Sequence, residues 1–264
     1  MSVFNKVMRP GDGGAWVTGA SGGIGRALVL RLAKAGWTVY ATARGADSLA
    51  KLAAEAPDKI IPAPSDVTDL DRMREIVAEI TGEHPLALAV LNAGIYTPMR
   101  ANDFSAETAA KMFNVNMTGV TNALDPVIKH MIDRGPGHIA ITSSVAGFRG
   151  LPDASAYSAP TAGLIAMAES LALDMIDLGI RISVINPGFV ETEATSVNSF
   201  EMPFLMSPEE AAARIFQGLR KPGFEITFPR RFGLMLRLIG LLPNRAYFWA
   251  QRKMLGWDGR AERG

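Results

Sequence analysis

The chain has 264 residues, of which 48% are hydrophobic and 20% charged, so it is long enough for one large domain with a substantial buried core. It contains no cysteine, which excludes disulfides, thiol nucleophiles and cysteine-bound metals. The three histidines, His84, His130 and His138, are widely spaced, so we expect neither a metal site nor a Ser-His-Asp triad. The formal net charge of +1 conceals an asymmetry, because residues 230–264 hold 8 Lys or Arg against 2 Asp or Glu.

Short apolar runs alternate with helical patterns along the chain. We expect strands at residues 15–19, 38–43, 60–63, 86–94, 138–144, 181–188 and 224–228. We expect helices at residues 25–35, 47–56, 69–82, 106–132, 157–178 and 207–219. This alternation, with no internal repeat, predicts a single doubly wound, Rossmann-like α/β domain. Its sheet should be mostly parallel, with about seven strands and helices on both faces.

A glycine-rich segment, TGASGGIG at residues 18–25, separates the first predicted strand from the first helix. Gly19, Gly23 and Gly25 permit a tight turn in which backbone N–H groups approach a pyrophosphate at the helix N-terminus. The spacing G-x-x-x-G-x-G differs from the G-x-G-x-x-G of most dinucleotide-binding domains. Taken alone, the segment therefore indicates dinucleotide binding only weakly.

The end of the second predicted strand bears on the choice of cofactor. An acidic residue there would bind the adenine ribose 2′-hydroxyl and select NAD, whereas a nearby arginine accommodates the 2′-phosphate of NADP. Here Ala43 stands at the acidic position and Arg44 follows it. We therefore favour NADP(H) as cofactor, with NAD(H) as the alternative should Arg44 be only a solvated surface charge.

Further motifs follow the glycine turn in a consistent order. They are Asp66 within SDVTD, the triplet NAG at residues 92–94, Asn116 within NVNMTG, Ser144 placed 13 residues before Tyr157, and NPGFVET at residues 186–192. Together with TGASGGIG, this pattern resembles the short-chain dehydrogenase/reductase family over residues 15–192. The resemblance implies an NAD(P)-dependent oxidoreductase that interconverts a carbonyl and a secondary alcohol.

The resemblance also implies roles for individual residues. Ser144 would polarise the substrate carbonyl, Tyr157 would exchange a proton with its oxygen, and Asn116 would seat a water in the proton relay. The cofactor-binding residues that it implies are Gly19, Ser21, Gly23, Ile24, Gly25, Arg44, Asp66, Val67, Asn92, Ala93, Gly94, Tyr157, Pro187, Gly188, Val190 and Thr192.

One position departs from the family pattern. Tyr-x-x-x-Lys would place a lysine at position 161, where this chain has Thr161. In the family that lysine binds the nicotinamide ribose and lowers the tyrosine pKa from its usual value of about 10, by roughly 1–3 units for a close cation. Thr161 carries no charge, and at most its hydroxyl would serve the ribose. Pro160 should fit the first turn of the helix, which leaves the helix intact.

Three explanations are open. The enzyme works with a less acidic tyrosine, helped by the oxidised cofactor or by an arginine such as Arg149. Alternatively, the protein is a catalytically impaired dinucleotide-binding or sensing module. Finally, the sequence itself has been altered at this position. We favour the first, because Asn116, Ser144 and Tyr157 are all retained.

The domain organisation is expected to have two parts. Residues 1–229 would form the catalytic domain, with a substrate lid around residues 191–206. The lid is rich in adaptable apolar residues, which suits a lipid-like, aromatic or steroid-like carbonyl compound. They are Phe200, Met202, Phe204, Leu205 and Met206. The alternative is that these side chains pack on the body of the protein or on a partner subunit.

Residues 230–264 would form a basic amphipathic extension in which arginines alternate with large apolar residues. Peripheral contact with an anionic membrane, a partner-subunit contact or pocket wall, and plain core packing are the three alternatives. We expect no nucleic-acid binding, since no recognition motif accompanies the basic residues. The resemblance implies a homodimer or homotetramer. Without a signal-peptide pattern or a run of about 20 apolar residues, we expect a cytoplasmic protein, with a membrane-peripheral location as the alternative.

Overall fold

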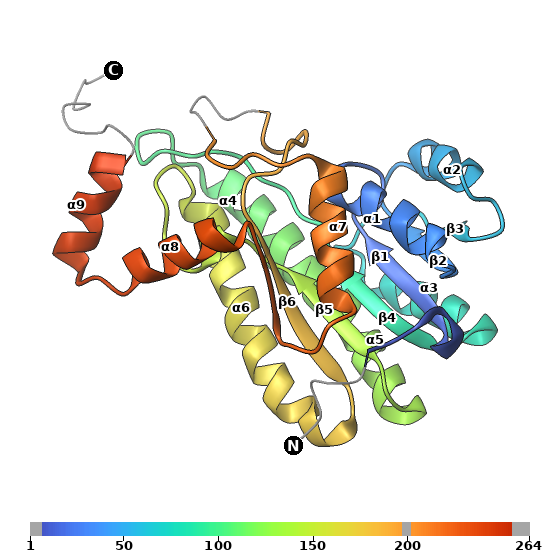
Figure 1. The fold of residues 1–264 in the computed structure, drawn as a ribbon. Coiled ribbons are helices and arrows are strands. Elements are labelled where there is room, and N and C mark those ends of the chain that lie inside the picture. Colours follow the sequence, from blue (N-terminus) through green and yellow to red (C-terminus); the bar gives the residue numbers. More distant parts are fainter. Residues whose placement is uncertain (1–6, 197–201, 255–264) are drawn as a thin grey trace.

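The computed structural model describes residues 7–196 and 202–254, and its centre is one seven-stranded sheet. The strands are β1 Gly14–Thr18, β2 Val39–Thr42, β3 Ile60–Pro62, β4 Leu86–Leu91, β5 His138–Thr142, β6 Arg181–Pro187 and β7 Glu225–Phe228. The α-helices are α1 Gly23–Lys34, α2 Ala46–Ala54, α3 Leu70–Glu83, α4 Ala106–Phe113, α5 Gly119–Arg134, α6 Ser155–Met175, α7 Pro208–Leu219, α8 Arg230–Gly240 and α9 Asn244–Met254. Figure 1 shows the helices arranged on both sides of the sheet.

The strand order is β3-β2-β1-β4-β5-β6-β7, and every pairing is parallel. The chain winds outward in one direction from β1 and in the other from β4, so the topology reverses between these two strands. The predicted doubly wound domain is confirmed, and its sheet is parallel throughout. In such folds ligands bind outside the carboxyl ends of the strands at this reversal point.

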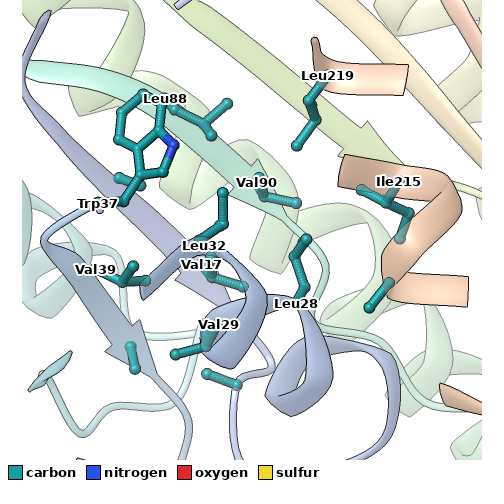
Figure 2. Packing of buried hydrophobic residues seen from close by; sticks show 14 of the residues in the cluster. Val17, Leu28, Val29, Leu32, Trp37, Val39, Leu88, Val90, Ile215 and Leu219 are labelled. Atoms are coloured by element: carbon teal, nitrogen blue, oxygen red, sulfur yellow. The ribbon is translucent and has the colours of Figure 1, made fainter. Parts of the chain in front are cut away.

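Two apolar layers cover the sheet. On one face, α1, α2 and α7 bury residues such as Leu28, Leu32 and Ile215. Figure 2 shows α1 and α7 meeting there over Val17 and Val90. On the other face, α3, α5 and α6 bury residues that include Met73, Val127 and Leu164. Burial on both faces explains why the strands read as continuous apolar runs.

The long helix expected over residues 106–132 is interrupted. α4 ends at Phe113, a π-helical turn spans Asn114–Thr118, and α5 continues to Arg134. π-turns insert an extra residue per turn and are often found at functional sites. The residue inside this turn that matters for the site is Asn116.

The C-terminal helices lie beyond the edge strand β7. Figure 1 shows α8 and α9 at the left of the molecule, on the side of α6 and far from α2 and α3. Neither they nor any other helix among the described residues is long and apolar enough to cross a membrane. Residues 255–264 of the predicted extension lie outside the described residues.

Candidate active site

The predicted site residues converge on the carboxyl edge of the sheet. The glycine turn follows β1, Arg44 follows β2, Asp66 follows β3 and the NAG triplet follows β4. Ser144 follows β5, and the segment NPGFVET begins with the last two residues of β6. The backbone ties neighbouring loops together, since the amide of Ala20 donates to the carbonyl of Thr42 (3.0 Å) and that of Ser65 to the carbonyl of Ala43 (3.0 Å).

The glycine turn is too tightly packed for larger residues. Gly19 has a φ of +69°, and a Cβ there would lie 2.8 Å from the Cα of Ala93. A Cβ on Gly25 would lie 2.0 Å from the carbonyl oxygen of Gly19. Gly23, with a φ of +49°, would meet the methyl group of Thr192 at 2.8 Å. The glycines therefore bring the turn against both the NAG segment and the segment after β6.

The N-terminus of α1 is open to a ligand. Its N-cap, Gly22, provides no side-chain cap, and both Ser21 and Gly22 are exposed. Ile24 packs against the core below the turn. First-turn N–H groups and the positive end of the helix dipole suit a phosphate. The residues present therefore fit the diphosphate of a dinucleotide.

Thr18, which sequence reasoning did not single out, anchors the NAG segment. Its Oγ1 accepts hydrogen bonds from the amides of Asn92 (2.9 Å) and Ala93 (3.1 Å). The Asn92 side chain donates to the Thr18 carbonyl (3.3 Å) and accepts from Thr142 Oγ1 (3.5 Å). A polar residue at the end of an otherwise apolar strand was the available signal. These bonds join the ends of β1, β4 and β5 where the topology reverses.

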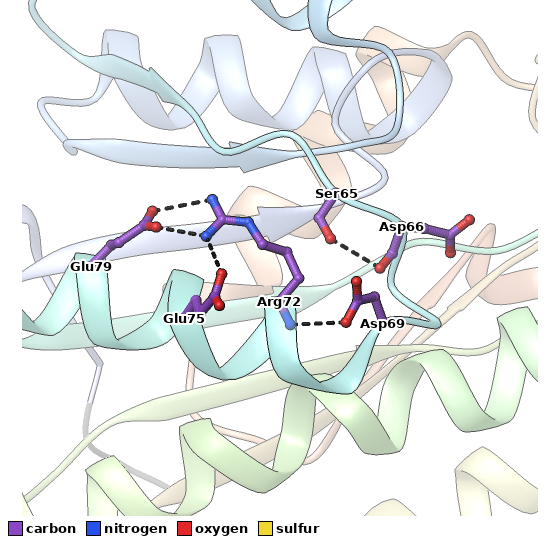
Figure 3. Close-up of polar contacts among 6 residues, drawn as sticks. All are labelled: Ser65, Asp66, Asp69, Arg72, Glu75 and Glu79. Carbon is purple, nitrogen blue, oxygen red and sulfur yellow. Dashed lines mark hydrogen bonds and ion pairs between the residues drawn. The ribbon is translucent and has the colours of Figure 1, made fainter.

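Arg44, Asp66 and Val67 follow β2 and β3, on the part of the carboxyl edge where the adenosine of a dinucleotide is expected. Arg44 is exposed. The Asp66 carboxylate accepts from the amide and hydroxyl of Thr68 (both 2.9 Å), which fixes the loop that leads into α3. Figure 3 shows Asp66 just before α3, with Asp69 capping that helix through the amide of Arg72. A buried hydrogen bond from Asn122 to the Val67 carbonyl (3.1 Å) holds the same loop against α5.

Asn116 is held rigidly in the π-turn. It is buried, and its side chain both accepts from the amide of Ile95 (2.8 Å) and donates to the carbonyl of Ile95 (2.8 Å). A Cβ on Gly94 would lie 3.4 Å from its Oδ1. Asn116 therefore fastens the segment after NAG to the helix that faces α6.

The side chains of Ser144 and Tyr157 lie close together, near enough for the serine hydroxyl to influence the pKa of the phenol. Ser144 is buried in extended backbone, and its Oγ accepts from the amide of Ala146 (3.1 Å). Tyr157 is partly buried, and the ring of Tyr96 packs edge-on against it at 5.0 Å between centroids. The hydroxyl and the phenol thus converge, as the proton exchange inferred from the sequence requires.

The pKa of Tyr157 is raised from its usual value by burial, and the nearby Ser144 hydroxyl lowers it by a smaller amount. Within residues 7–196 and 202–254, no lysine or arginine contributes to this shift. Burial also raises the pKa of neighbouring Tyr96, to about 12. The site therefore keeps Tyr157 protonated at neutral pH.

Thr161 does not take the orientation expected of a ribose ligand. Its side chain is buried, and its Oγ1 shares its proton between the carbonyls of Tyr157 (2.8 Å) and Ser158 (3.1 Å). Threonine in a helix commonly bonds back to the i−4 carbonyl in this way. The prediction that Pro160 lies in the first turn of the helix is wrong, because α6 begins at Ser155 and Pro160 therefore lies in its second turn. The helix tolerates the proline there.

Arg149 does not serve as a substitute cation. Its guanidinium donates to the carbonyls of Gly240 (2.6 Å) and Leu242 (2.7 Å) and to Asn244 Oδ1 (2.6 Å). It also stacks over the ring of Tyr247, 3.9 Å from its centroid. Arg149 therefore binds the junction between α8 and α9, and the expectation that it reaches Tyr157 is wrong.

The segment after β6 carries the remaining predicted cofactor residues. The amide of Gly188 donates to the Phe228 carbonyl (2.7 Å), which fixes the Pro187–Gly188 turn beside β7. Val190 is buried and forms a bridge with Met206, where the amide of Glu191 donates to the Met206 carbonyl (2.9 Å). The two ends of the predicted lid are thus paired. Phe200 of the lid lies outside the described residues.

These features define an α/β oxidoreductase of the dinucleotide-binding class. A sequence profile described as short chain dehydrogenase matches residues 14–201. The chain belongs to the short-chain dehydrogenase/reductase family.

Several known proteins are similar to this chain. An uncharacterized oxidoreductase of Myxococcus xanthus is 38% identical over 247 residues, which cover 91% of this chain and 96% of that protein. The 3-oxoacyl-(acyl-carrier-protein) reductase of Thermotoga maritima is 36% identical over 183 residues, 68% of this chain and 74% of that protein. The solved structure of an actinorhodin polyketide ketoreductase with NADPH has a TM-score of 0.76 at 25% identity, over 86% of this chain and 99% of that one.

Proposed function

We propose that the protein is an NADPH-dependent reductase of a small, hydrophobic carbonyl compound, and that the reverse reaction oxidises the secondary alcohol. The observation that carries this proposal is the proximity of the Ser144 and Tyr157 side chains at the carboxyl edge of the sheet. When bound, the nicotinamide supplies or takes up the hydride. The protein supplies the proton and aligns the substrate carbonyl with the nicotinamide.

The proton chemistry favours reduction. Burial keeps Tyr157 neutral at physiological pH, so its phenol is ready to donate a proton to a carbonyl oxygen as that oxygen gains charge. Ser144, buried and fixed by its bond with Ala146, would donate a hydrogen bond to the same oxygen. In the reverse direction Tyr157 must first lose its proton, and its raised pKa makes that step unfavourable below alkaline pH.

The same proposal assigns the residues that bind the cofactor. The glycine turn, Asp66, Val67, the NAG triplet and residues 187–192 would hold the dinucleotide, and Arg44 would pair with the 2′-phosphate that distinguishes NADP(H). The actinorhodin ketoreductase similar to this chain was solved with NADPH, which supports the choice. NAD(H) is the alternative.

The substrate class follows from the residues near the lid. Phe204 packs against Phe232 at 5.8 Å between ring centroids, and Phe189 packs against the same ring at 5.8 Å. The exposed ring of Phe204 at the lid would offer an aromatic contact to an apolar carbonyl compound. The Thermotoga maritima relative is a 3-oxoacyl-(acyl-carrier-protein) reductase, so a 3-oxoacyl thioester belongs in the substrate panel.

Several broader expectations belong to the same proposal. Residues 1–229 would be the catalytic domain, residues 191–206 its lid and residues 230–264 an extension. The enzyme would act in the cytoplasm as a homodimer or homotetramer.

A second candidate is a dinucleotide-binding or sensing protein with little turnover. It is favoured by Thr161, whose hydroxyl is committed to its own helix, and by Arg149, which is committed to the α8–α9 junction. In that case the crevice would bind NADPH without reducing any member of a broad panel.

The experiment that tests the proposal measures NADPH consumption with cyclohexanone, acetophenone and an acetoacetyl thioester. Tyr157→Phe should reduce the rate by about a hundredfold or more, in the range general acid catalysis contributes, while NADPH binding measured by fluorescence weakens by no more than about tenfold, the contribution of one hydrogen bond. The matched control is Tyr40→Phe, which removes a phenol bonded to Glu83 away from the crevice (2.9 Å). Equal activity of Tyr157→Phe and the control would refute the proposal, and binding without turnover would favour the second candidate.

A further inference from the structure

The outer surface of α8 and α9 is unusually apolar. Five side chains on it are each more than half exposed, and Leu241 reaches 82%. They are Leu234, Leu238, Leu241, Phe248 and Trp249, and we call this set the α8–α9 outer face. Large exposed apolar side chains that gather on two successive helices are typical of interaction surfaces.

The outer face is distinct from the side of α8 that stabilises the fold. Phe232 and Leu236 are buried and pack with Val145, next to Ser144. Leu234, Leu238 and Leu241 repeat at i, i+4 and i+7, so they form one stripe along the helix, turned away from that buried side. Packing of the domain therefore does not account for these leucines.

The charge of the same segment is entirely positive. Residues 230–254 contain six basic residues and no acidic one. Arg237 is engaged with Glu225 of β7, and Lys253 stacks near Trp249, 5.1 Å from its ring centroid. The other basic residues are Arg230, Arg231, Arg245 and Arg252. A surface that complements this one must be apolar and negatively charged.

A second copy of the chain meets that requirement poorly. Most homodimers are two-fold symmetric and bring the same patch of both subunits together, so a dimer through the outer face would join two segments that carry only basic charges. Like charges brought together in an interface destabilise it. An anionic bilayer surface instead offers negative headgroups above an apolar interior, and Trp and Phe are favoured at that boundary.

Exposed apolar side chains also occur at the predicted lid. Phe204 and Leu205 are exposed, and Phe204 contacts Phe232 on the buried side of α8, so they are separate from the outer face.

We propose that the α8–α9 outer face docks the protein on an anionic lipid bilayer. The docking is interfacial: the apolar side chains enter the headgroup region while the arginines contact anionic lipids. It does not depend on the oxidoreductase activity, so it can be tested in the absence of any substrate.

The test is co-sedimentation of the full chain with vesicles. Binding to phosphatidylglycerol/phosphatidylcholine vesicles should exceed binding to pure phosphatidylcholine by about tenfold or more, because each basic residue near an anionic surface adds about fivefold. The triple variant Leu234→Ser/Leu238→Ser/Leu241→Ser should lose binding by at least about tenfold.

The matched control is Ile132→Ser/Leu173→Ser/Leu178→Ser, which removes three exposed apolar side chains elsewhere on the surface and should bind as the wild type does. Melting temperatures and light scattering check that each variant is folded and report its oligomeric state. Absence of wild-type binding, equal binding to neutral vesicles, or equal loss in the control would overturn the proposal. Dissociation of a wild-type oligomer by the triple variant, without vesicle binding by the wild type, would identify a partner copy as the occupant instead.

Discussion

Replacing Thr161 with lysine tests whether the missing charge controls the acidity of Tyr157. Position 161 lies one helical turn after Tyr157, and its side chain is only 3% exposed. A cation so close should lower the pKa of Tyr157 by roughly 1–3 units, or about 1.4–4 kcal/mol in favour of the phenolate. The substitution also removes the hydroxyl bond to the Tyr157 carbonyl and buries an ammonium, so we expect a stability loss of roughly 1–3 kcal/mol.

The assay is the pH dependence of initial rates in both directions, with cyclohexanol and NADP⁺ or cyclohexanone and NADPH. In the wild type, alcohol oxidation should rise only at strongly alkaline pH, because Tyr157 must first ionise. In Thr161→Lys the rise should move toward neutral pH by roughly 1–3 units, while ketone reduction near neutrality changes little. Thr161→Met provides a side chain of similar length without charge and should keep the wild-type profile. Identical profiles for the lysine and methionine variants would refute the reasoning.

Three further predictions concern other residues. Arg44→Ala should weaken NADPH binding in calorimetric titrations by about tenfold to a hundredfold, the contribution of one charge-assisted hydrogen bond. NADH binding should not change. The control Lys51→Ala, which removes a cation from α2, should leave the binding of both cofactors unchanged. Arg149→Ala removes three hydrogen bonds that are partly exposed to solvent, so it should cost roughly 2–3 kcal/mol. In calorimetry this corresponds to a melting temperature about 4–12 °C lower. Arg149→Lys should recover little of the lost stability. An unchanged melting temperature in Arg149→Ala would contradict a stabilising role for these hydrogen bonds. His138 is fully buried and burial holds its pKa well below the usual value, so the unfolded chain takes up its proton first as the pH falls below about 6.5. Urea unfolding should therefore show stability lost with falling pH in the wild type, by up to about 1.4 kcal/mol per pH unit, and a shallower dependence in His138→Gln; equal slopes would contradict this.

The sequence predicted the order and type of the sheet elements because both faces of the sheet are covered, which makes each strand a distinct apolar run. It also placed Asp66, the NAG triplet, Ser144 and the segment after β6 at strand ends, and parallel strands bring such ends to one edge. The glycine turn was recognisable because tight backbone approach allows no other residue at Gly19 or Gly25.

Other features had no readable signal. The π-turn at Asn116 adds one residue to a helical repeat, and a single extra residue cannot be distinguished from ordinary variation in the apolar pattern. The partners of Arg149 lie 91 to 95 positions further along the chain, and an isolated arginine does not reveal so distant an acceptor. The orientation of Thr161 was more accessible, since threonine hydroxyls in helices commonly bond to the preceding turn.

The bonds of Arg149 have a consequence for how the chain can be divided. Every strand of the described residues lies before residue 229. Yet Arg149, in the loop that joins Ser144 to Tyr157, donates to Gly240, Leu242 and Asn244, and the Tyr247 hydroxyl donates to the Gly150 carbonyl (2.7 Å). A chain ending at residue 229 would lack the acceptors of Arg149 and would expose Val145, which is next to Ser144. α8 and α9 therefore hold in place the loop that joins Ser144 to Tyr157, and we expect a chain shortened at residue 229 to lose the geometry of these two side chains.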